Sequence, residues 1–101
     1  MKALVSVYDK VEIIELALGL HAKGYELIST GGSAKAINSH DGLSATEVAE
    51  ITGFPEMLDG RVKTLHPHIH GGILAKRNNP SHIASLSFQG ISNIDLVVVN
   101  L

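Results

Sequence analysis

A short run of glycine and hydroxyl side chains has the composition of an anion-binding turn. Residues 29–33 read Ser-Thr-Gly-Gly-Ser and separate a β-prone segment from a helical pattern. Glycine backbone at a helix amino terminus presents several N–H donors, and the helix dipole favours phosphate there. An ordinary turn with Ser33 as helix N-cap explains the same residues. Phosphate binding is thus one of two interpretations, and it concerns Thr30, Gly31, Gly32 and Ser33.

A second run, Gly60 to Pro67, places two cations and a hydroxyl close together. If this run is extended, alternation directs Arg61 and Lys63 to the same side, which we expect to face the glycine turn. Arginine can clamp a phosphate or carboxylate through two hydrogen bonds, and lysine can stabilise a developing oxyanion as a point charge. Thr64 adds the hydroxyl. A solvated basic face accounts equally well for this spacing.

Three histidines and one polar triplet are further candidates. The alternate spacing of His66, His68 and His70 could bring imidazoles together as metal ligands. No cysteine or carboxylate completes such a set, so packing, hydrogen bonding or substrate contact is favoured and no metal site is predicted. A polar triplet follows the first predicted strand, where ligand contacts are expected: Tyr8, Asp9 and Lys10. Asp9 is explained equally well as a helix cap.

The elements that position these residues follow the order strand, helix, strand, glycine turn, helix. Residues 3–7 form an apolar run typical of a strand buried on both faces. Asp9 and Glu12 form a capping-box variant, and the helix they begin should run to about Lys23. Residues 25–30 are β-prone, and a second helix follows from Ala34. The first helix should bury one face, consisting of Ile13, Leu16, Ala17 and Leu20. Right-handed crossovers then predict an open parallel sheet covered by helices.

Further along, the pattern is less regular. Residues 52–72 fit neither period and contain several glycines and prolines, and such a long irregular segment usually carries function. A weaker helix is expected over Ser81 to Gln89, with Ile83 and Leu86 directed inward. Residues 95–101 are predicted to form another buried strand. Because active sites of open α/β sheets lie just past the carboxyl ends of strands, Asn100 is well placed for ligand contact.

Composition excludes several classes of protein. With 101 residues, of which 45% are hydrophobic and 18% charged, the chain can form at most one compact domain. A net charge of −2 argues against generic binding to nucleic acid or to an anionic membrane. The absence of cysteine excludes disulfides and thiolate chemistry. The amino terminus lacks the apolar length of a signal peptide, so we expect a cytoplasmic protein.

Three stretches together resemble a known family. The run Thr52 to Pro67, TGFPEMLDGRVKTLHP, is followed by HGGILA at residues 70–75. The glycine turn with its helix, STGGSAKA, and the opening VSVYDK appear in the same order. These stretches, together with DLVVVNL at residues 95–101, resemble the bifunctional AICAR transformylase/IMP cyclohydrolase family. The likeness covers essentially the whole chain, and the Gly60 to Pro67 run is its most specific part.

The resemblance implies a fold and a reaction. The fold is methylglyoxal-synthase-like, an incomplete three-layer α/β/α sandwich, and residues 1–101 are the N-terminal part of the IMP cyclohydrolase domain. The reaction is the dehydrative ring closure of formyl-AICAR to IMP in purine biosynthesis, without a cofactor. The family's transformylase domain, which uses 10-formyltetrahydrofolate, is absent from this chain. The implied partner is a purine ribonucleotide, with no nucleic acid and no membrane, and the full-length protein is expected to be a homodimer.

The resemblance also assigns residue roles. The turn from Thr30 to Ser33 holds the nucleotide phosphate. Lys63 is catalytic because it stabilises charge on the formyl oxygen, and Thr64 positions the base. The remaining residues that line the pocket are Tyr8, Asp9, Lys10, Arg61 and Asn100.

This sequence departs from the family at two residues and at its end. Tyr8 replaces a frequent serine, and Ser33 replaces a frequent threonine while keeping the hydroxyl. Family members continue past Leu101 to a catalytic aspartate and lysine, so we expect this chain alone to bind better than it catalyses. Two alternatives are a non-catalytic allosteric module of the same fold and a methylglyoxal synthase. The Arg-Val-Lys-Thr run at residues 61–64 favours the cyclohydrolase over the allosteric module.

Overall fold

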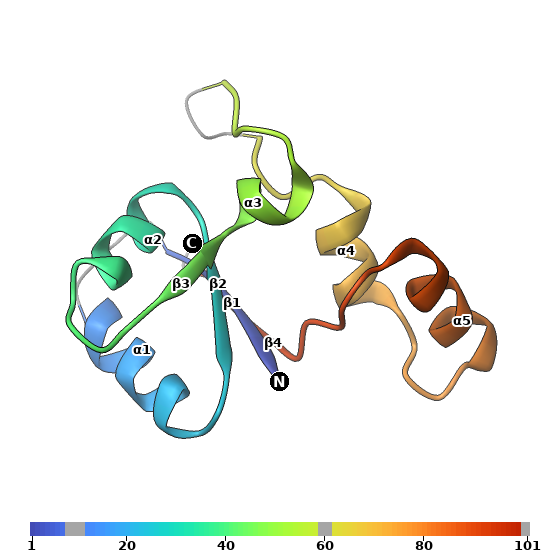
Figure 1. Ribbon diagram of the computed structural model, residues 1–101, viewed down its shortest axis with the longest axis horizontal. Coiled ribbons are helices and arrows are strands. Elements are labelled where there is room, and N and C mark those ends of the chain that lie inside the picture. Colours follow the sequence, from blue (N-terminus) through green and yellow to red (C-terminus); the bar gives the residue numbers. More distant parts are fainter. Residues whose placement is uncertain (8–11, 59–61, 100–101) are drawn as a thin grey trace.

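A four-stranded parallel sheet forms the middle layer of the protein (Figure 1). The computed structural model describes residues 1–7, 12–58 and 62–99. Across the sheet, the strands stand in the order β3-β2-β1-β4. Their bounds are Lys2–Ser6 for β1, Glu26–Ser29 for β2, Ala45–Glu47 for β3 and Leu96–Val99 for β4. All pairings are parallel, as the βαβ order predicts, so the strands end at the same edge.

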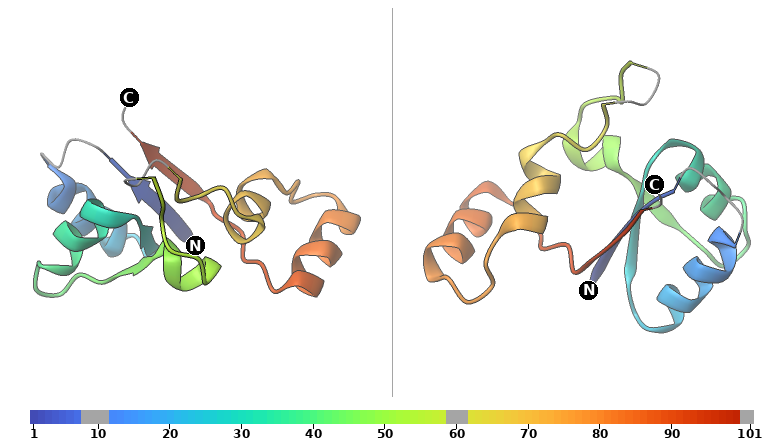
Figure 2. Two further views of the ribbon diagram at one scale, coloured as in Figure 1. Left: turned by 90° about the horizontal axis from the view of Figure 1, so that it is seen from above. Right: turned by 180° about the vertical axis from the view of Figure 1, so that it is seen from behind.

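Helices cover both faces of this sheet (Figures 1 and 2). On one face lie α1, Ile13–Ala22, and α2, Gly31–Asn38. On the other lie α3, Val48–Thr52, and α4, Pro67–Leu74, while α5, Pro80–Gln89, packs outside α4. This arrangement confirms the predicted three-layer α/β/α sandwich. Within the described residues, no helix combines the length and apolar character needed to cross a bilayer.

The central strand β1 supplies side chains to two separate cores. Ala3 and Val5 are fully buried against α1 and α2, whereas Leu4 packs on the opposite face. On that face Leu4 lies beside Ile28 of β2 and beneath Ile69 of α4. Because successive strand residues point to opposite faces, a strand that is covered on both sides must be apolar throughout. The run at residues 3–5 meets this requirement.

The last strand differs from the prediction of another buried strand. In the described residues β4 pairs with β1 alone, and Val97 and Val99 are 42% and 56% exposed. Leu96 and Val98 pack towards the core below α1. On the other face, α4 directs Ile69 towards the core around Leu4 and leaves Val97 partly uncovered. A continuous apolar run therefore did not distinguish a central strand from an edge strand.

Two predicted helices also need correction. The structure begins α1 at Ile13, with Glu12 as N-cap at φ 66° and without a side-chain cap. Glu12 is therefore not the third helical residue that the capping box requires, and Asp9 lies outside the described residues. Leu16 is 36% exposed, although the rest of the predicted apolar face is buried. Similarly, Leu86 of α5 is buried but Ile83 is 50% exposed. Each helix packs along a narrower stripe than its apolar residues suggest.

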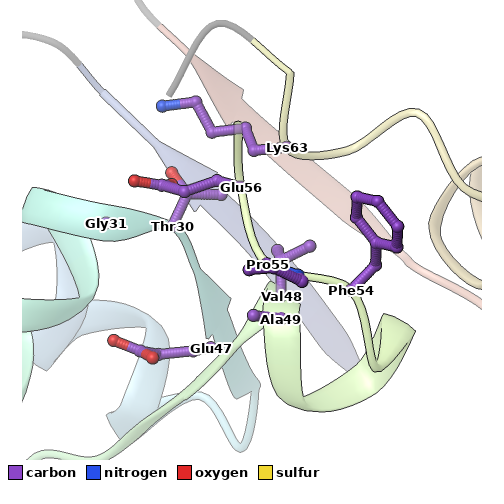
Figure 3. A pocket seen from close by; sticks show the side chains of 9 residues that line it. All are labelled: Thr30, Gly31, Glu47, Val48, Ala49, Phe54, Pro55, Glu56 and Lys63. Carbon is purple, nitrogen blue, oxygen red and sulfur yellow. The ribbon is translucent and has the colours of Figure 1, made fainter. Parts of the chain in front are cut away.

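Part of the segment predicted to be irregular is helical. Helix α4 begins at Pro67, where proline is favoured because its missing N–H needs no partner, and His66 is its N-cap. The Nδ1 atom of His66 accepts a hydrogen bond from the His68 N–H at 3.1 Å. Among the described residues, the irregular part is confined to 53–58 and 62–66, which are joined by an antiparallel bridge between Met57 and Val62. Part of this loop lies beside the carboxyl ends of β2 and β3 (Figure 3).

One glycine of α4 is required by close packing. A Cβ atom added to Gly72 would lie 2.3 Å from the Ser92 carbonyl oxygen, and the Gly72 carbonyl accepts the Ile94 N–H at 3.0 Å. A Cβ atom on the adjacent Gly71 would instead meet the Ile91 Cδ1 atom at 3.3 Å. The neighbour of Gly72 is a backbone atom, whereas the neighbour of Gly71 is the end of a flexible side chain. The segment before β4 therefore docks on α4 through Gly72.

We predict that Gly72→Ala lowers the free energy of unfolding by about 1 to 3 kcal/mol, because the backbone at Ser92 must move. Gly71→Ala is the matched control, since it makes the same change one residue earlier in the helix. Its gain in helix propensity, up to about 1 kcal/mol, should offset a small adjustment of Ile91. Urea unfolding of both variants measures the difference. Equal stability of the two variants would contradict the packing described.

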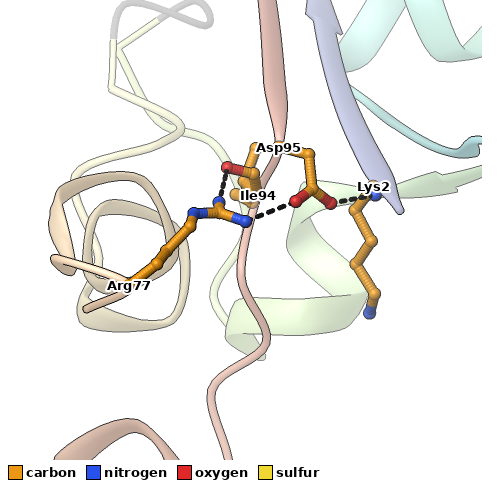
Figure 4. A network of polar contacts seen from close by, with 4 residues as sticks. All are labelled: Lys2, Arg77, Ile94 and Asp95. Carbon is orange, nitrogen blue, oxygen red and sulfur yellow. Dashed lines mark hydrogen bonds and ion pairs between the residues drawn. The ribbon is translucent and has the colours of Figure 1, made fainter. Parts of the chain in front are cut away.

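Asp95 ties the starts of β1 and β4 to the connection between α4 and α5 (Figure 4). Its carboxylate accepts the Lys2 N–H at 2.7 Å and pairs with Arg77, and its own N–H donates to the Lys2 carbonyl at 2.8 Å. Arg77 also donates to the Ile94 carbonyl at 2.8 Å. The Lys2 N–H, followed by Arg77, holds the pKa of Asp95 below its usual value. The charged carboxylate thus stabilises the register of the edge strand.

We predict that Asp95→Asn lowers the thermal midpoint at neutral pH and that this loss shrinks in acid. A carboxylate whose pKa is depressed on folding stabilises the fold above its unfolded pKa, and this contribution is lost as pH falls through the folded value. Melts at pH 7 and at about pH 3 test this. Glu26→Gln is the control, because Glu26 pairs with the Lys2 side chain at 3.5 Å but is 74% exposed. A pH-independent effect of Asp95→Asn would refute the prediction.

Candidate functional site

A cavity of about 230 Å³ opens at the carboxyl ends of β2 and β3 (Figure 3). It lies between the start of α2 and the loop that follows α3. The described residues that line it are Thr30, Gly31, Glu47, Val48, Ala49, Phe54, Pro55, Glu56 and Lys63. Open parallel sheets bind their ligands at this edge, so the cavity is the candidate site.

The amino end of α2 forms one wall of the cavity. Thr30 is the N-cap residue in an extended conformation, and Gly31 follows at φ +38°, in the region that favours glycine. The helix therefore begins at Gly31, which corrects the interpretation of Ser33 as N-cap. The Ala34 N–H makes the first bond back to the Thr30 carbonyl at 3.0 Å. The amides that precede Ala34 have no acceptor within the helix and can serve an anion.

The hydroxyl groups near this wall make hydrogen bonds to other groups of the protein. The Ser33 hydroxyl donates a hydrogen bond to the Val7 carbonyl at 3.0 Å. It also accepts one from the Val7 N–H at 3.1 Å. The Ser6 and Thr30 hydroxyls bond to each other at 2.8 Å. Ser33 and Thr30 are only 2% and 4% exposed. An anion at this end of α2 would thus be held by backbone amides rather than by these hydroxyls.

Lys63 forms part of the opposite wall. The bridge between Met57 and Val62 closes the loop just before it, and its side chain extends towards α2 (Figure 3). Lys63 also lines a second cavity of about 170 Å³. The other residues that line the second cavity are Phe54, Pro55, Val62, Leu65 and His66. Lys63 therefore lines both the cavity at the start of α2 and a mainly apolar hollow.

Two carboxylates at the first cavity were missed in the sequence. Glu47 ends β3, and Glu56 belongs to the loop. The Glu56 oxygens lie 3.3 and 3.4 Å from the position of a Cβ atom added to Gly31, so the carboxylate stands against the start of α2. Glu56 is within the quoted family run, but a loop glutamate gives no local signal of the distant segment that it will meet. Sequence offered no signal for Glu47, because a three-residue strand carries no clear periodicity.

Thr64, His66 and His70 make hydrogen bonds around the start of α4. Thr64 is absent from the described cavity lining, and its carbonyl accepts the His66 N–H at 2.8 Å and lies 2.6 Å from the His70 Nδ1 atom. His66 caps the helix. Among the described residues, no group of three or more His, Cys, Asp or Glu side chains could hold a metal ion. His66 thus caps α4 and His70 contacts the turn before it, whereas the buried Nδ1 atom of His68 has no hydrogen-bond partner in the described part of the chain.

The structure brings together some of the predicted site residues. Thr30, Gly31 and Lys63 line one cavity, with Gly32 and Ser33 following in the first turn of α2. Five further predicted residues lie outside the described residues: Tyr8, Asp9, Lys10, Arg61 and Asn100. The expectation that Lys63 faces the glycine turn is met. The matching expectation for Arg61 stays a prediction.

Comparison with known proteins places the chain in a family. The model of a family described as MGS-like domain matches residues 12–101. The chain belongs to the MGS-like domain family. It is 59% identical over 100 residues to the bifunctional purine biosynthesis protein PurH of Ruegeria pomeroyi, and 56% identical to that of Brucella ovis. Each alignment covers 99% of this chain but only 19% and 18% of those relatives, so the chain spans about a fifth of their length.

A solved structure supports the same assignment. The crystal structure of ForH superposes with a TM-score of 0.85 at 38% sequence identity, covering 99% of this chain and 50% of that one. The resemblance to the bifunctional purine-biosynthesis family and the methylglyoxal-synthase-like fold are thereby confirmed. This MGS-like domain places its candidate cavity at the sheet edge where α/β folds bind ligands.

We predict that Ser33→Ala lowers the free energy of unfolding by about 1 to 3 kcal/mol, because two hydrogen bonds to Val7 are lost in a buried site. Ser39→Ala is the control on the same helix: that hydroxyl also bonds a backbone carbonyl, of Ala36, but is exposed. It should change stability by less than about 0.5 kcal/mol. Chemical denaturation measures both. A loss for Ser33→Ala no larger than that for Ser39→Ala would show that this hydroxyl does not hold β1 to α2.

Proposed function

We propose that this MGS-like domain binds a purine ribonucleotide and acts in IMP cyclohydrolase chemistry within purine biosynthesis in the cytoplasm. The proposal treats the chain as the N-terminal part of a cyclohydrolase domain that uses no cofactor. Support comes from the 59% and 56% identity to bifunctional purine biosynthesis proteins over 99% of the chain. The full-length relative would be a homodimer. In it, a separate domain would formylate AICAR with 10-formyltetrahydrofolate as formyl donor.

The observation that carries the proposal is the shared cavity of Gly31 and Lys63. In that cavity, the phosphate would bind the first amides of α2, where N–H donors and the helix dipole favour an anion. Lys63 would then stand across the cavity from the phosphate, next to the hollow lined by Phe54 and Leu65. A planar heteroaromatic ring suits such a hollow, because its faces are apolar and its edge is polar.

The reaction needs charge stabilisation at one oxygen. The carboxamide nitrogen of formyl-AICAR attacks the formyl carbon, a C–N bond forms, and the formyl oxygen gains negative charge. The Lys63 ammonium would stabilise that oxygen, which then takes up two protons and leaves as water while the ring C=N bond forms to the former formamide nitrogen. The carboxamide nitrogen and the formamide nitrogen each give up one proton, with the help of a general base and a general acid. Tyr8, Asp9, Lys10, Arg61, Thr64 and Asn100 complete the proposed pocket.

We expect IMP to bind the chain and the Gly32→Val variant to bind it at least tenfold more weakly. The added side chain would stand on the exposed first turn of α2 and keep phosphate from its amides. Tenfold corresponds to about 1.4 kcal/mol, the order of one charge-assisted hydrogen bond. Isothermal titration calorimetry measures both affinities.

Two controls sharpen this test. Gly19→Val makes the same change in α1, where an added Cβ atom would meet nothing within 4 Å, and should leave IMP binding unchanged. Inosine lacks the phosphate, so it should bind more weakly and be indifferent to Gly32→Val. Equal affinity of the wild type and Gly32→Val for IMP would contradict the proposed phosphate site.

A further inference from the structure

The His66 side chain belongs to a helix cap and to a cavity wall at the same time. Its Nδ1 atom accepts the hydrogen bond from the His68 N–H at 3.1 Å that caps α4. The same residue lines the hollow of about 170 Å³ beside Lys63, where the proposed function places the heteroaromatic ring. A group fixed by the fold therefore borders the proposed position of the base.

The cap determines which ring nitrogen carries the hydrogen. A nitrogen that accepts an N–H bond presents a lone pair, so the hydrogen of the His66 imidazole lies on Nε2. Within the described part of the chain, Nε2 makes no hydrogen bond, and Nδ1 of His68 is the side-chain atom that is both buried and unpaired. Nε2 of His66 is therefore an accessible donor, on the side of the ring away from the amide that Nδ1 caps.

Several contacts hold the His66 ring in place. The His66 N–H donates to the Thr64 carbonyl at 2.8 Å. The His66 carbonyl accepts the N–H groups of Ile69 and His70 at 3.0 and 2.9 Å. The His68 ring lies next to it, with the ring centroids 5.1 Å apart and the planes tilted by 42°. A donor that is held in this way loses little conformational freedom when an acceptor binds to it.

We propose that the Nε2–H group of His66 donates a hydrogen bond to an acceptor on the edge of the base and thereby selects the base that binds beside Lys63. The inference rests on the proposed function, because it assumes that the base occupies this hollow. The hollow is otherwise mainly apolar, with Phe54 and Leu65 among its walls, so a donor there orients the base as well as binding it. A base that turned an N–H group towards Nε2 would leave two donors facing each other and would be rejected.

Two substitutions of His66 separate the roles of its nitrogens. His66→Asn keeps an acceptor for the cap, so its thermal midpoint should stay near that of the wild type, but it removes the donor at Nε2. It should bind IMP and inosine roughly threefold to tenfold more weakly, as expected for the loss of one neutral hydrogen bond. His66→Gln should do the opposite. Its longer amide replaces the donor and keeps the affinity, whereas its weaker cap lowers the thermal midpoint.

His82→Asn is the matched control and should leave binding unchanged. Nδ1 of His82 also accepts a backbone N–H, from Lys76 at 3.0 Å, but His82 lies between α4 and α5 and lines neither cavity of the candidate site. Calorimetry with IMP, inosine and inorganic phosphate measures the affinities, and inorganic phosphate should not distinguish His66→Asn from the wild type. NMR of the ring nitrogens should show the His66 hydrogen on Nε2 in the free protein.

The outcomes distinguish this inference from the proposed function. If the wild type binds IMP and His66→Asn binds it equally well, the donor is refuted while the proposed function stands. Equal losses of affinity in His66→Asn and His66→Gln, or a ring hydrogen on Nδ1, would also overturn the donor. If the wild type does not bind IMP, both proposals fail.

Discussion

The position of β1 at the centre of the sheet is the constraint on which the rest of the structure depends. It is hydrogen bonded to β2 on one side and to β4 on the other, and its alternate side chains enter two different cores. Parallel pairing on both sides fixes the carboxyl ends of three strands at one edge. The candidate cavity opens at this edge, beyond the carboxyl ends of β2 and β3. The location of the site thus follows from strand pairing rather than from any one functional residue.

Sequence patterns predicted the elements that are long or chemically distinctive. The apolar run of β1, the helical face of α1 and the glycine start of α2 were all recognisable, because each satisfies one strong local requirement. The family run around Lys63 identified one side of the cavity from the sequence alone. These signals were sufficient for the α/β sandwich and for half of the site.

What escaped the sequence depends on tertiary contact. Strand β3 and helix α3 have three and five residues, too few for a period to be visible. Val97 has the residue type of a buried strand, and only the position of α4 determines that it is partly exposed. Glu56 has the residue type of a solvated loop position, and only the folded protein places it next to Gly31. Local propensity carries no information on which distant segments meet.

The two walls of the cavity differ in how firmly they are held. On the α2 side, Ser33 is bonded twice to Val7 and Thr30 is bonded to Ser6, so partly buried hydrogen bonds fix the start of the helix to the end of β1 and the residue after it. On the loop side, the described residues 53–58 and 62–66 have the Met57–Val62 bridge as their regular pairing, and Phe54, Glu56 and Leu65 are exposed. A ligand that enters between such walls can reposition the second more cheaply than the first, since fewer buried contacts must break. In the proposed function, the helix end would therefore supply a preorganised anion site, and the loop that carries Lys63 would adjust to the rest of the ligand.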